Sequence, residues 1–127
     1  MFSSLEIFQT SHAMARHAGS RQALTAANMA NADTPGYRAQ SMASFADSYT
    51  ANPASDMRAT RAGHLGSGAL FTPPDIQFTD AESSPNGNSV SLEQEMINGV
   101  EIQREHSRAL AIYKHSLDVL RMSLGRR

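Results

Sequence analysis

The chain has no cysteine and no tryptophan, and only 6% of its 127 residues are aromatic. Without cysteine there is neither a disulfide nor a thiolate metal site, while both reducing and oxidising compartments stay open. Because large rigid side chains are few, the sequence predicts a thin core. Alanine, serine and seven methionines dominate instead, which suits helices that pack closely through small contacts.

A strong net charge and long apolar runs are also missing. The formal net charge is −1, so there is no excess of basic groups to neutralise the phosphates of a nucleic acid. The first residues, MFSSLEIFQTSHAMARH, have neither a basic start nor a continuous apolar run. We therefore expect no nucleic-acid binding, no cleaved signal peptide and no membrane span.

Motifs typical of enzymes and metal sites are absent as well. The five histidines are too unevenly spaced for a ligand set, and the sequence contains no HExxH and no nucleophile elbow. The glycine run at residues 63–68 lacks the Lys-Ser or Lys-Thr that follows a phosphate-binding loop. The sequence thus predicts no catalytic residues, no metal and no cofactor. The histidines are His12, His17, His64, His106 and His115.

A helix is predicted over residues 3–31, where apolar side chains recur at helical spacing. The apolar stripe is narrow, because Ser11 and Gln22 interrupt it. Gly19 lowers the helix propensity by about 1 kcal/mol relative to alanine, so this helix alone would be marginal. Its candidate packing residues are Ile7, Phe8, Met14, Ala18 and Met29.

The middle of the chain, residues 38–90, has a different character and contains four of the five prolines. A short helical turn near SMASFADSY and an extended piece around IQFTD are the regular structure expected there. Pro73 and Pro74 exclude helix, and Asn86-Gly87 favours a tight turn. Some fifty residues without a core of their own predict a functional loop, a flexible segment or a region ordered by a neighbour.

Residues 91–127 carry the most regular pattern, a heptad repeat that alternates steps of four and three from Leu92 to Leu124. Ser91 followed by Gln94 predicts a capping box at the start of this helix. The candidate packing residues of this predicted seam are Leu92, Met96, Leu110, Tyr113, Leu117, Leu120 and Leu124.

Together the patterns predict a mainly α fold with no large inserted domain. Long N- and C-terminal helices, within segments 1–37 and 91–127, pack as an antiparallel hairpin or coiled coil, and the irregular Pro/Gly-rich segment 38–90 joins them. Both stripes contain small or polar residues where a closed coiled coil has Leu or Ile. Two readings stay open: a helical hairpin with irregular packing, and a subunit whose helices pack against copies or relatives of itself.

One stretch, ANMANADTPGY at residues 27–37, predicts a helix stop made of several redundant parts. Asn31 tolerates the left-handed conformation that ends helices, and the side chain of Asp33 is able to bond to backbone amides ahead of it. Pro35 drives Thr34 out of helical geometry, and Pro35-Gly36 suits the centre of a type II turn. Local chemistry alone also fits a simple helix end without any partner.

Two asparagines and a tyrosine complete this stretch. Asn28 and Asn31 are three residues apart, so they project from one helix face. Their amides are able to pair with each other, with the turn or with a neighbouring chain. Tyr37 follows the turn as an amphipathic anchor.

The order Ala-Asn-x-Ala-Asn-x-x-Thr-Pro-Gly-Tyr resembles the N-terminal motif of bacterial flagellar rod and hook proteins. A second stretch, GNSVSLEQEM at residues 87–96, is similar to the segment that introduces the C-terminal helix in the proximal rod proteins. Sibling rod proteins carry a C-terminal Gln-Arg-Ala-Tyr-x-Ala-Asn signature. Here Gln103-Arg104 is similar to the start of that signature, but His106 and Ser107 follow and no Ala-Asn appears, which favours the proximal members.

The resemblance implies a structural role in the flagellar basal body. Such proteins are exported unfolded by the flagellar type III apparatus without a cleaved signal, and they polymerise into the periplasm-spanning tube. Implied partners are further copies, other rod subunits, a basal junction protein, the membrane ring and the export gate. The implied assembly motif comprises Asn28, Asn31, Asp33, Thr34, Pro35, Gly36 and Tyr37. The alternative is a soluble helical-hairpin adaptor that binds a partner through the C-terminal seam.

Overall fold

A computed structural model describes residues 2–51, 75–79 and 82–125 of the chain. Two long helices dominate it, and the predicted mainly α fold without a large inserted domain is confirmed. The predictions for Pro73-Pro74, His64 and the glycine run at 63–68 fall outside the described residues. In chain order the elements are α1 (Phe2–Ala30), β1 (Gln40–Ser41), α2 (Phe45–Ala51), β2 (Gln77–Phe78) and α3 (Leu92–Ser123).

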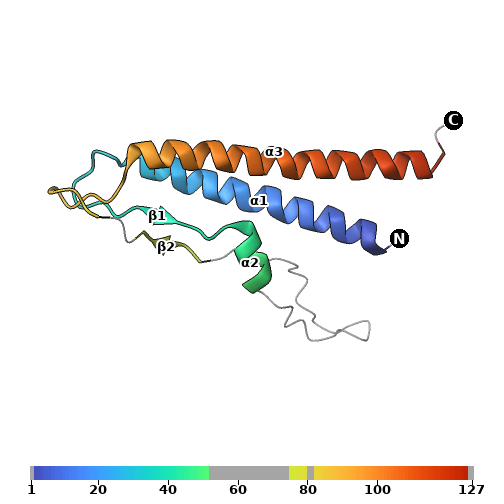
Figure 1. Cartoon of the computed structure of the whole chain (residues 1–127), viewed down its shortest axis with the longest axis horizontal. Helices are drawn as coiled ribbons and strands as arrows, with labels where there is room; N and C mark the ends of the chain where they lie inside the picture. The colour runs from blue at the N-terminus through green and yellow to red at the C-terminus, as the bar shows by residue number, and fades with distance from the viewer. Residues whose placement is uncertain (1, 52–74, 80–81, 126–127) are drawn as a thin grey trace.

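The two long helices run antiparallel, so both ends of the chain lie at the same end of the molecule (Figure 1). Helix α1 lies in the middle: α3 packs on one side of it, and the layer of β1, β2 and α2 lies on the other. At the opposite end, residues 31–37 and 82–90 form two adjoining turns. Helix α1 is therefore the element against which the other described segments are positioned.

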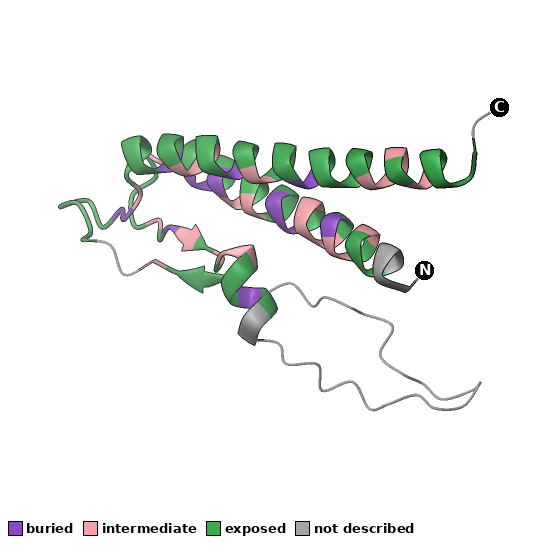
Figure 2. Ribbon diagram, turned by 45° about the vertical axis from the view of Figure 1, so that its right-hand side comes forward, coloured by how far each residue is buried: buried purple, intermediate pink, exposed green. Residues whose placement is uncertain are grey.

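Where they meet, the two long helices each bury a row of residues at a spacing of seven (Figure 2). That spacing is the period of an antiparallel helix pair wound at 3.5 residues per turn. Apart from Ile102, the residues of these rows are small or polar, and the small ones let the backbones approach closely. The row of α1 is Ser11, Ala18 and Thr25, and the row of α3 is Glu95, Ile102 and Ala109. Helix α1 also buries His17 and Asn28, which contact α2 and β1.

The predicted C-terminal seam is displaced by one residue from the row that α3 buries. Met96 follows the buried Glu95, and Leu110 follows the buried Ala109; one residue is a rotation of about 100° around the helix. Met96 is accordingly 58% exposed and Leu110 51% exposed, and Leu92 and Leu124 are exposed too. In the single chain, α3 therefore turns Glu95, Ile102 and Ala109 toward α1 and leaves these four residues exposed, and their part in packing between helices stays a prediction.

Of the other predicted packing residues, some are buried or half-buried and some are exposed. Ala18 is buried, and Phe8 meets Tyr113 edge to face, with 5.2 Å between the ring centroids. Ile7 and Met29 are exposed. Met14, Leu117 and Leu120 are half-buried.

Close approach and one ion pair hold the helix pair together. A Cβ added to Gly99 would lie 3.9 Å from Thr25 Cγ2, so the backbone of α3 passes near the α1 side chain at that level. Arg21 on α1 donates to Glu105 on α3 at 2.8 Å, and both side chains are largely shielded from solvent. Among the described residues, the buried hydrophobic side chains are only Ala18, Ala39, Ile102 and Ala109, and this confirms the predicted thin core.

At the start of helix α3, half of the predicted capping box forms. The Ser91 hydroxyl accepts from the Gln94 amide N–H at 3.5 Å, and the extended backbone of Ser91 is typical of an N-cap. The Gln94 side chain does not return to Ser91. It donates to Asn98 Oδ1 at 3.2 Å, so the reciprocal half of the box is missing.

The small layer under α1 starts with an antiparallel strand pair, in which Gln40 pairs with Phe78 and Ser41 with Gln77. The Thr79 amide extends the pairing by donating to the Ala39 carbonyl at 2.9 Å. Strand β2 lies at the extended piece expected around IQFTD, and α2 lies at the helical turn expected in SMASFADSY. The layer is thus tied to α1 close to the helix stop.

Candidate functional site

The helix stop is built around Asn31. Helix α1 ends at Ala30, and the Asn31 amide N–H still donates to the carbonyls of Ala27 (3.2 Å) and Asn28 (3.1 Å). The Asn31 side chain donates to the Ala27 carbonyl at 2.8 Å and accepts from the Thr34 hydroxyl at 3.3 Å. Asn31 therefore connects the last turn of the helix to the chain that leaves it.

Two details of the predicted stop differ from the structure. No residue other than glycine has a positive φ in the described part of the chain, so the predicted left-handed conformation of Asn31 is wrong. The reason is that the free carbonyls at this end receive hydrogen bonds from another segment, described below. Asp33 is exposed, and its carboxylate makes no hydrogen bond within residues 2–51, 75–79 and 82–125.

The predicted turn forms at Pro35-Gly36. The Tyr37 amide N–H donates to the Thr34 carbonyl at 3.3 Å, and Gly36 has φ = +73°. A positive φ at the residue after proline is the geometry of a type II turn and favours glycine. The chain thereby reverses and runs back under α1.

Asn28 fixes the returning chain to α1. Its buried amide pairs with the backbone of Gln40 in both directions: Nδ2 donates to the Gln40 carbonyl at 2.8 Å, and Oδ1 accepts from the Gln40 N–H at 3.0 Å. The Tyr37 hydroxyl also donates to Oδ1, at 3.3 Å. Asn28 and Asn31 thus act on different segments, and they do not pair with each other.

Asn88 completes the helix stop from the second turn. It is buried, and its Nδ2 group donates to the carbonyls of Asn31 (3.0 Å), Ala32 (2.7 Å) and Thr34 (2.9 Å). Its Oδ1 accepts from the Val90 N–H at 2.7 Å, so the donating amide is held in place just before α3. One side chain therefore satisfies carbonyls at the end of α1 that a left-handed cap would otherwise serve.

Two glycines allow the turns to touch. The Gly36 N–H donates to the Asn86 carbonyl at 3.0 Å. Gly87 has φ = +79°, and a Cβ added there would lie 3.4 Å from Gly36 Cα. A side chain on Gly87 would therefore be strained by its backbone conformation and crowded by the other turn.

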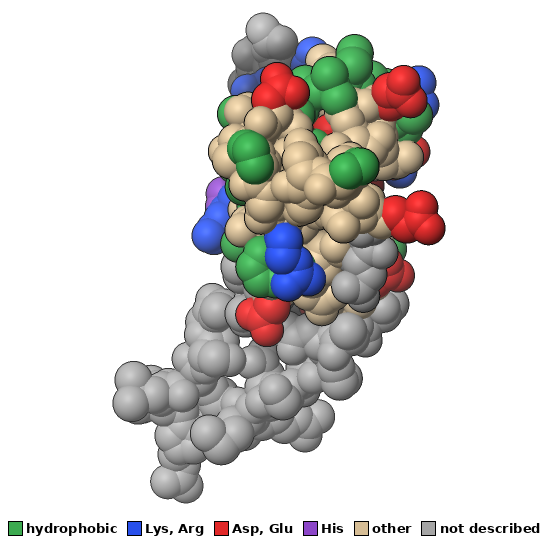
Figure 3. All heavy atoms as spheres, turned by 90° about the vertical axis from the view of Figure 1, so that its left-hand side faces the viewer, with side chains coloured by type: hydrophobic (Ala, Val, Ile, Leu, Met, Phe, Trp, Pro, Cys, Tyr) green, Lys and Arg blue, Asp and Glu red, His purple; other side chains and the backbone are tan. Residues whose placement is uncertain are grey.

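Ser89 forms the last connection. Its hydroxyl accepts from the Ala39 N–H at 2.9 Å, and its own N–H donates to the Tyr37 carbonyl at 3.1 Å. We call residues 28–40 and 84–90 together the turn clamp. Figure 3 looks onto this end of the molecule, where backbone and uncharged polar groups cover most of the described surface. The clamp fixes the end of α1 against the start of α3.

The structure thus brings most of the predicted assembly motif into one network, but it adds residues that the sequence reasoning missed. The similarity of GNSV at 87–90 to a family segment marked the right place, and the Asn86-Gly87 turn was a local signal. Neither signal identified Asn88 or Ser89 as partners of the motif. Contacts between residues more than fifty positions apart leave no periodic trace in one sequence.

His17 is a second buried polar residue that the sequence reasoning treated as an ordinary histidine. It lies on α1, and its ring meets Phe45 of α2 edge to face, with 5.7 Å between centroids. Burial lowers the pKa of His17 below the ordinary 6.5, and the charge of Arg21 lowers it further. A backbone hydrogen bond with Ala43 and the charge of Glu105 act in the opposite direction.

Two kinds of feature are not found in the part of the chain that the structure describes. No group of three or more His, Asp or Glu side chains is arranged to hold a metal ion. None of the described helices combines the length and hydropathy needed to cross a membrane.

An Asn88→Asp variant tests the turn clamp. The substitution keeps the shape of the side chain but replaces its donor with an acceptor facing three carbonyls. We expect a loss of about 2–3 kcal/mol of stability, measured by thermal loss of the helical circular dichroism signal. Asn98→Asp is the matched control, because Asn98 uses its Oδ1 as an acceptor. Equal melting curves for both variants would contradict the role assigned to Asn88.

The buried histidine predicts a dependence of stability on pH. Because the folded pKa of His17 lies below its unfolded value of 6.5, the unfolded chain binds the proton more readily. The contribution of neutral His17 is therefore present above pH 6.5 and is lost as pH falls below it. Between pH 5.5 and 7.5, the melting temperature of the wild type should rise with pH, and the slope of this rise should be smaller in His17→Gln. The exposed His12→Gln should keep it, and an unchanged slope in His17→Gln would refute the prediction.

Comparisons with known proteins bear on the first half of the clamp. A search of curated proteins finds no match to the chain. Residues 13–38 match the family model described as flagella basal body rod protein. The matched segment runs from the middle of α1 through Asn28, Asn31 and the type II turn to Arg38. Over this segment the chain is thus similar to the flagellar basal body rod proteins.

Proposed function

We propose that the chain is a structural subunit of the flagellar rod, most like the proximal rod protein FlgB. It polymerises through its terminal helices into the helical tube that transmits torque from the motor to the hook and filament, and that forms part of the export channel. It reaches the periplasm-spanning rod through the flagellar type III system without a cleaved signal. Its partners are further copies, other rod subunits, the basal junction protein, the membrane ring and the export gate.

The observation that carries this proposal is the imbalance between buried and exposed apolar side chains. The buried hydrophobic residues of the described chain are three alanines and Ile102. Nine large hydrophobic residues within α3 alone are exposed. They are Leu92, Met96, Ile97, Val100, Leu110, Ile112, Tyr113, Val119 and Met122.

An assembly resolves this imbalance. Full burial of a large apolar side chain contributes about 1.5–3 kcal/mol, and a single α1–α3 contact leaves most of that contribution unused on α3. Residues such as Ile97 and Leu110 lie on different sides of α3, so no single partner helix covers both. Several neighbours around each subunit, as in a tube, bury them together.

The turn clamp supports the same proposal. It holds residues 28–37 by hydrogen bonds to a segment more than fifty positions away, so the end of α1 has a fixed position relative to α3. In a polymer of identical subunits, a helix end at a fixed position sets the register of every repeated contact. We propose that Asn28, Asn31, Asp33, Thr34 and the Pro35–Tyr37 turn serve this purpose.

The competing function is a soluble helical-hairpin adaptor that binds its partner through the seam from Leu92 to Leu124. The exposure of Leu92, Met96 and Leu110 is compatible with it. An adaptor, however, requires one contact face, whereas apolar side chains are exposed on several sides of α3. The rod family match at residues 13–38 also favours a rod subunit.

A Gly36→Val variant tests the proposal in cells whose own copy is replaced by the variant. Gly36 has φ = +73°, and a left-handed conformation costs a branched residue about 1–2 kcal/mol. We expect export of the variant to persist, while its incorporation into rods and cell motility are lost. Both are measured by fractionation of basal bodies and by swimming assays.

Gly19→Val is the matched control. Both glycines have open space where a Cβ would be added, but Gly19 lies within α1 and lacks a positive φ. This control should assemble normally. Normal motility of Gly36→Val, or the absence of the wild-type chain from isolated basal bodies, would contradict the proposed function.

A further inference from the structure

The chain contains two Asn-Gly pairs, Asn86-Gly87 in the turn clamp and Asn98-Gly99 in α3. Asparagine is a thermolabile residue, because the backbone nitrogen that follows it is able to attack its side-chain amide. Glycine after asparagine favours this attack, since no Cβ shields the nitrogen. The two pairs have the same local chemistry, so a difference in their reactivity reports what the fold does to each.

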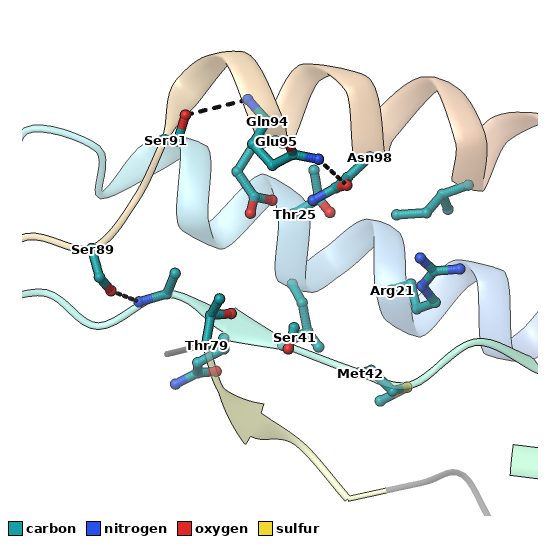
Figure 4. A pocket seen from close by; sticks show the side chains of 14 residues that line it. Arg21, Thr25, Ser41, Met42, Thr79, Ser89, Ser91, Gln94, Glu95 and Asn98 are labelled. Atoms are coloured by element: carbon teal, nitrogen blue, oxygen red, sulfur yellow. Dashed lines mark hydrogen bonds between the residues drawn. The ribbon is translucent and has the colours of Figure 1, made fainter. Parts of the chain in front are cut away.

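Helix α3 holds Asn98-Gly99 in an unreactive arrangement. Inside a helix, the Gly99 N–H donates to the carbonyl four residues before it, and the helical ψ keeps the Gly99 nitrogen away from the Asn98 Cβ. The Asn98 side chain accepts from Gln94 at 3.2 Å beside the cavity that it lines between α1 and α3 (Figure 4). A Cβ on Gly99 would lie 3.9 Å from Thr25 Cγ2, so this level of α3 faces α1. Attack on Asn98 therefore requires a turn of α3 to open.

In the turn clamp, Asn86-Gly87 is held by a turn and not by a helix. The Gly87 N–H donates to the Ser84 carbonyl at 2.8 Å, and Asn86 has a negative φ, which together indicate a type I turn. In this turn, the ψ of Asn86 keeps the Gly87 nitrogen away from the Asn86 Cβ. The Asn86 Oδ1 accepts from the Asn88 N–H at 3.0 Å. Both residues of the pair are exposed, however, and no helix has to unwind to release them.

We propose that Asn86 is a site of spontaneous deamidation in the folded chain, whereas α3 protects Asn98. The Gly87 backbone nitrogen forms a bond to the Asn86 Cγ and loses its proton, and the side-chain amide nitrogen leaves as ammonia. Water then opens the resulting succinimide ring at one of its two carbonyls, which gives aspartate or isoaspartate at position 86. The reaction consumes one water and releases one ammonia. It goes beyond the proposed function and does not depend on it.

The two products have different effects on the turn clamp. Aspartate keeps the backbone unchanged and keeps an acceptor oxygen for the Asn88 N–H. Isoaspartate routes the main chain through the former side chain and lengthens it by one methylene. The Asn86 carbonyl, which accepts from the Gly36 N–H at 3.0 Å, then becomes part of a side-chain carboxylate, and Gly87 is displaced from its place against Gly36. Formation of isoaspartate therefore disconnects the two turns.

Incubation of the purified full-length chain, followed by proteolysis and tandem mass spectrometry, tests the site. We expect Asn86 to be converted about tenfold faster than Asn98 in native buffer, because opening an exposed turn costs less than opening α3. In urea the two rates should be much closer, since both residues precede glycine. Fragment ions distinguish Asn86 from the buried Asn88. A ratio of Asn86 to Asn98 conversion in native buffer no greater than the ratio in urea would overturn the proposal.

A comparison of melting temperatures tests the effect of the modification on the turn clamp. Chain enriched in isoaspartate at position 86 should lose its helical circular dichroism signal at a lower temperature than wild type, because its two turns are no longer joined. Asn86→Asp is the matched control, since it has the charge of the isoaspartate form without the longer main chain. This variant should melt close to wild type. Equal melting temperatures of the isoaspartate form and Asn86→Asp would overturn the proposed effect on the clamp.

Discussion

The structure depends on one side-chain amide, that of Asn88, which donates to three carbonyls at the end of α1. Without this donor, the end of α1 would need either a left-handed residue or water to satisfy its carbonyls. Because Asn88 supplies this donor, a residue from the C-terminal half of the chain satisfies the carbonyls at the end of α1. Ser89 and the Gly36–Gly87 contact then hold the returning chain beside the same point. The antiparallel helix pair is therefore aligned from its turn end.

Although the turn end aligns the two helices, the contact along their length buries few apolar side chains. Apart from Ile102, the residues in the rows at their contact are small or polar, so the contact removes little apolar surface from water. The larger apolar side chains of α3 are left exposed beside that contact. A chain with a defined turn end and an incomplete core is suited to be a part of an assembly, in which neighbours supply the missing contacts.

The sequence predicts the local parts of this molecule well and the long-range parts poorly. Both long helices, the Ser91 cap and the Pro35-Gly36 turn follow from spacing and backbone preferences of a few adjacent residues. The face of α3 that meets α1 does not, because a heptad of Leu and Met marks apolar residues without saying which partner covers them. Asn88, Glu95 and His17 were missed for a related reason: burial of a polar side chain depends on segments that are distant in the chain.

We propose that the terminal helices gain their full stability only when subunits assemble. Amide hydrogen exchange of α1 and α3, measured in the isolated chain and in purified rods, tests it most directly. We expect rapid exchange along both helices of the isolated chain, with the slowest amides near the turn clamp, and strong protection throughout in the rod. Uniformly slow, cooperative exchange of both helices in the isolated monomer would contradict it.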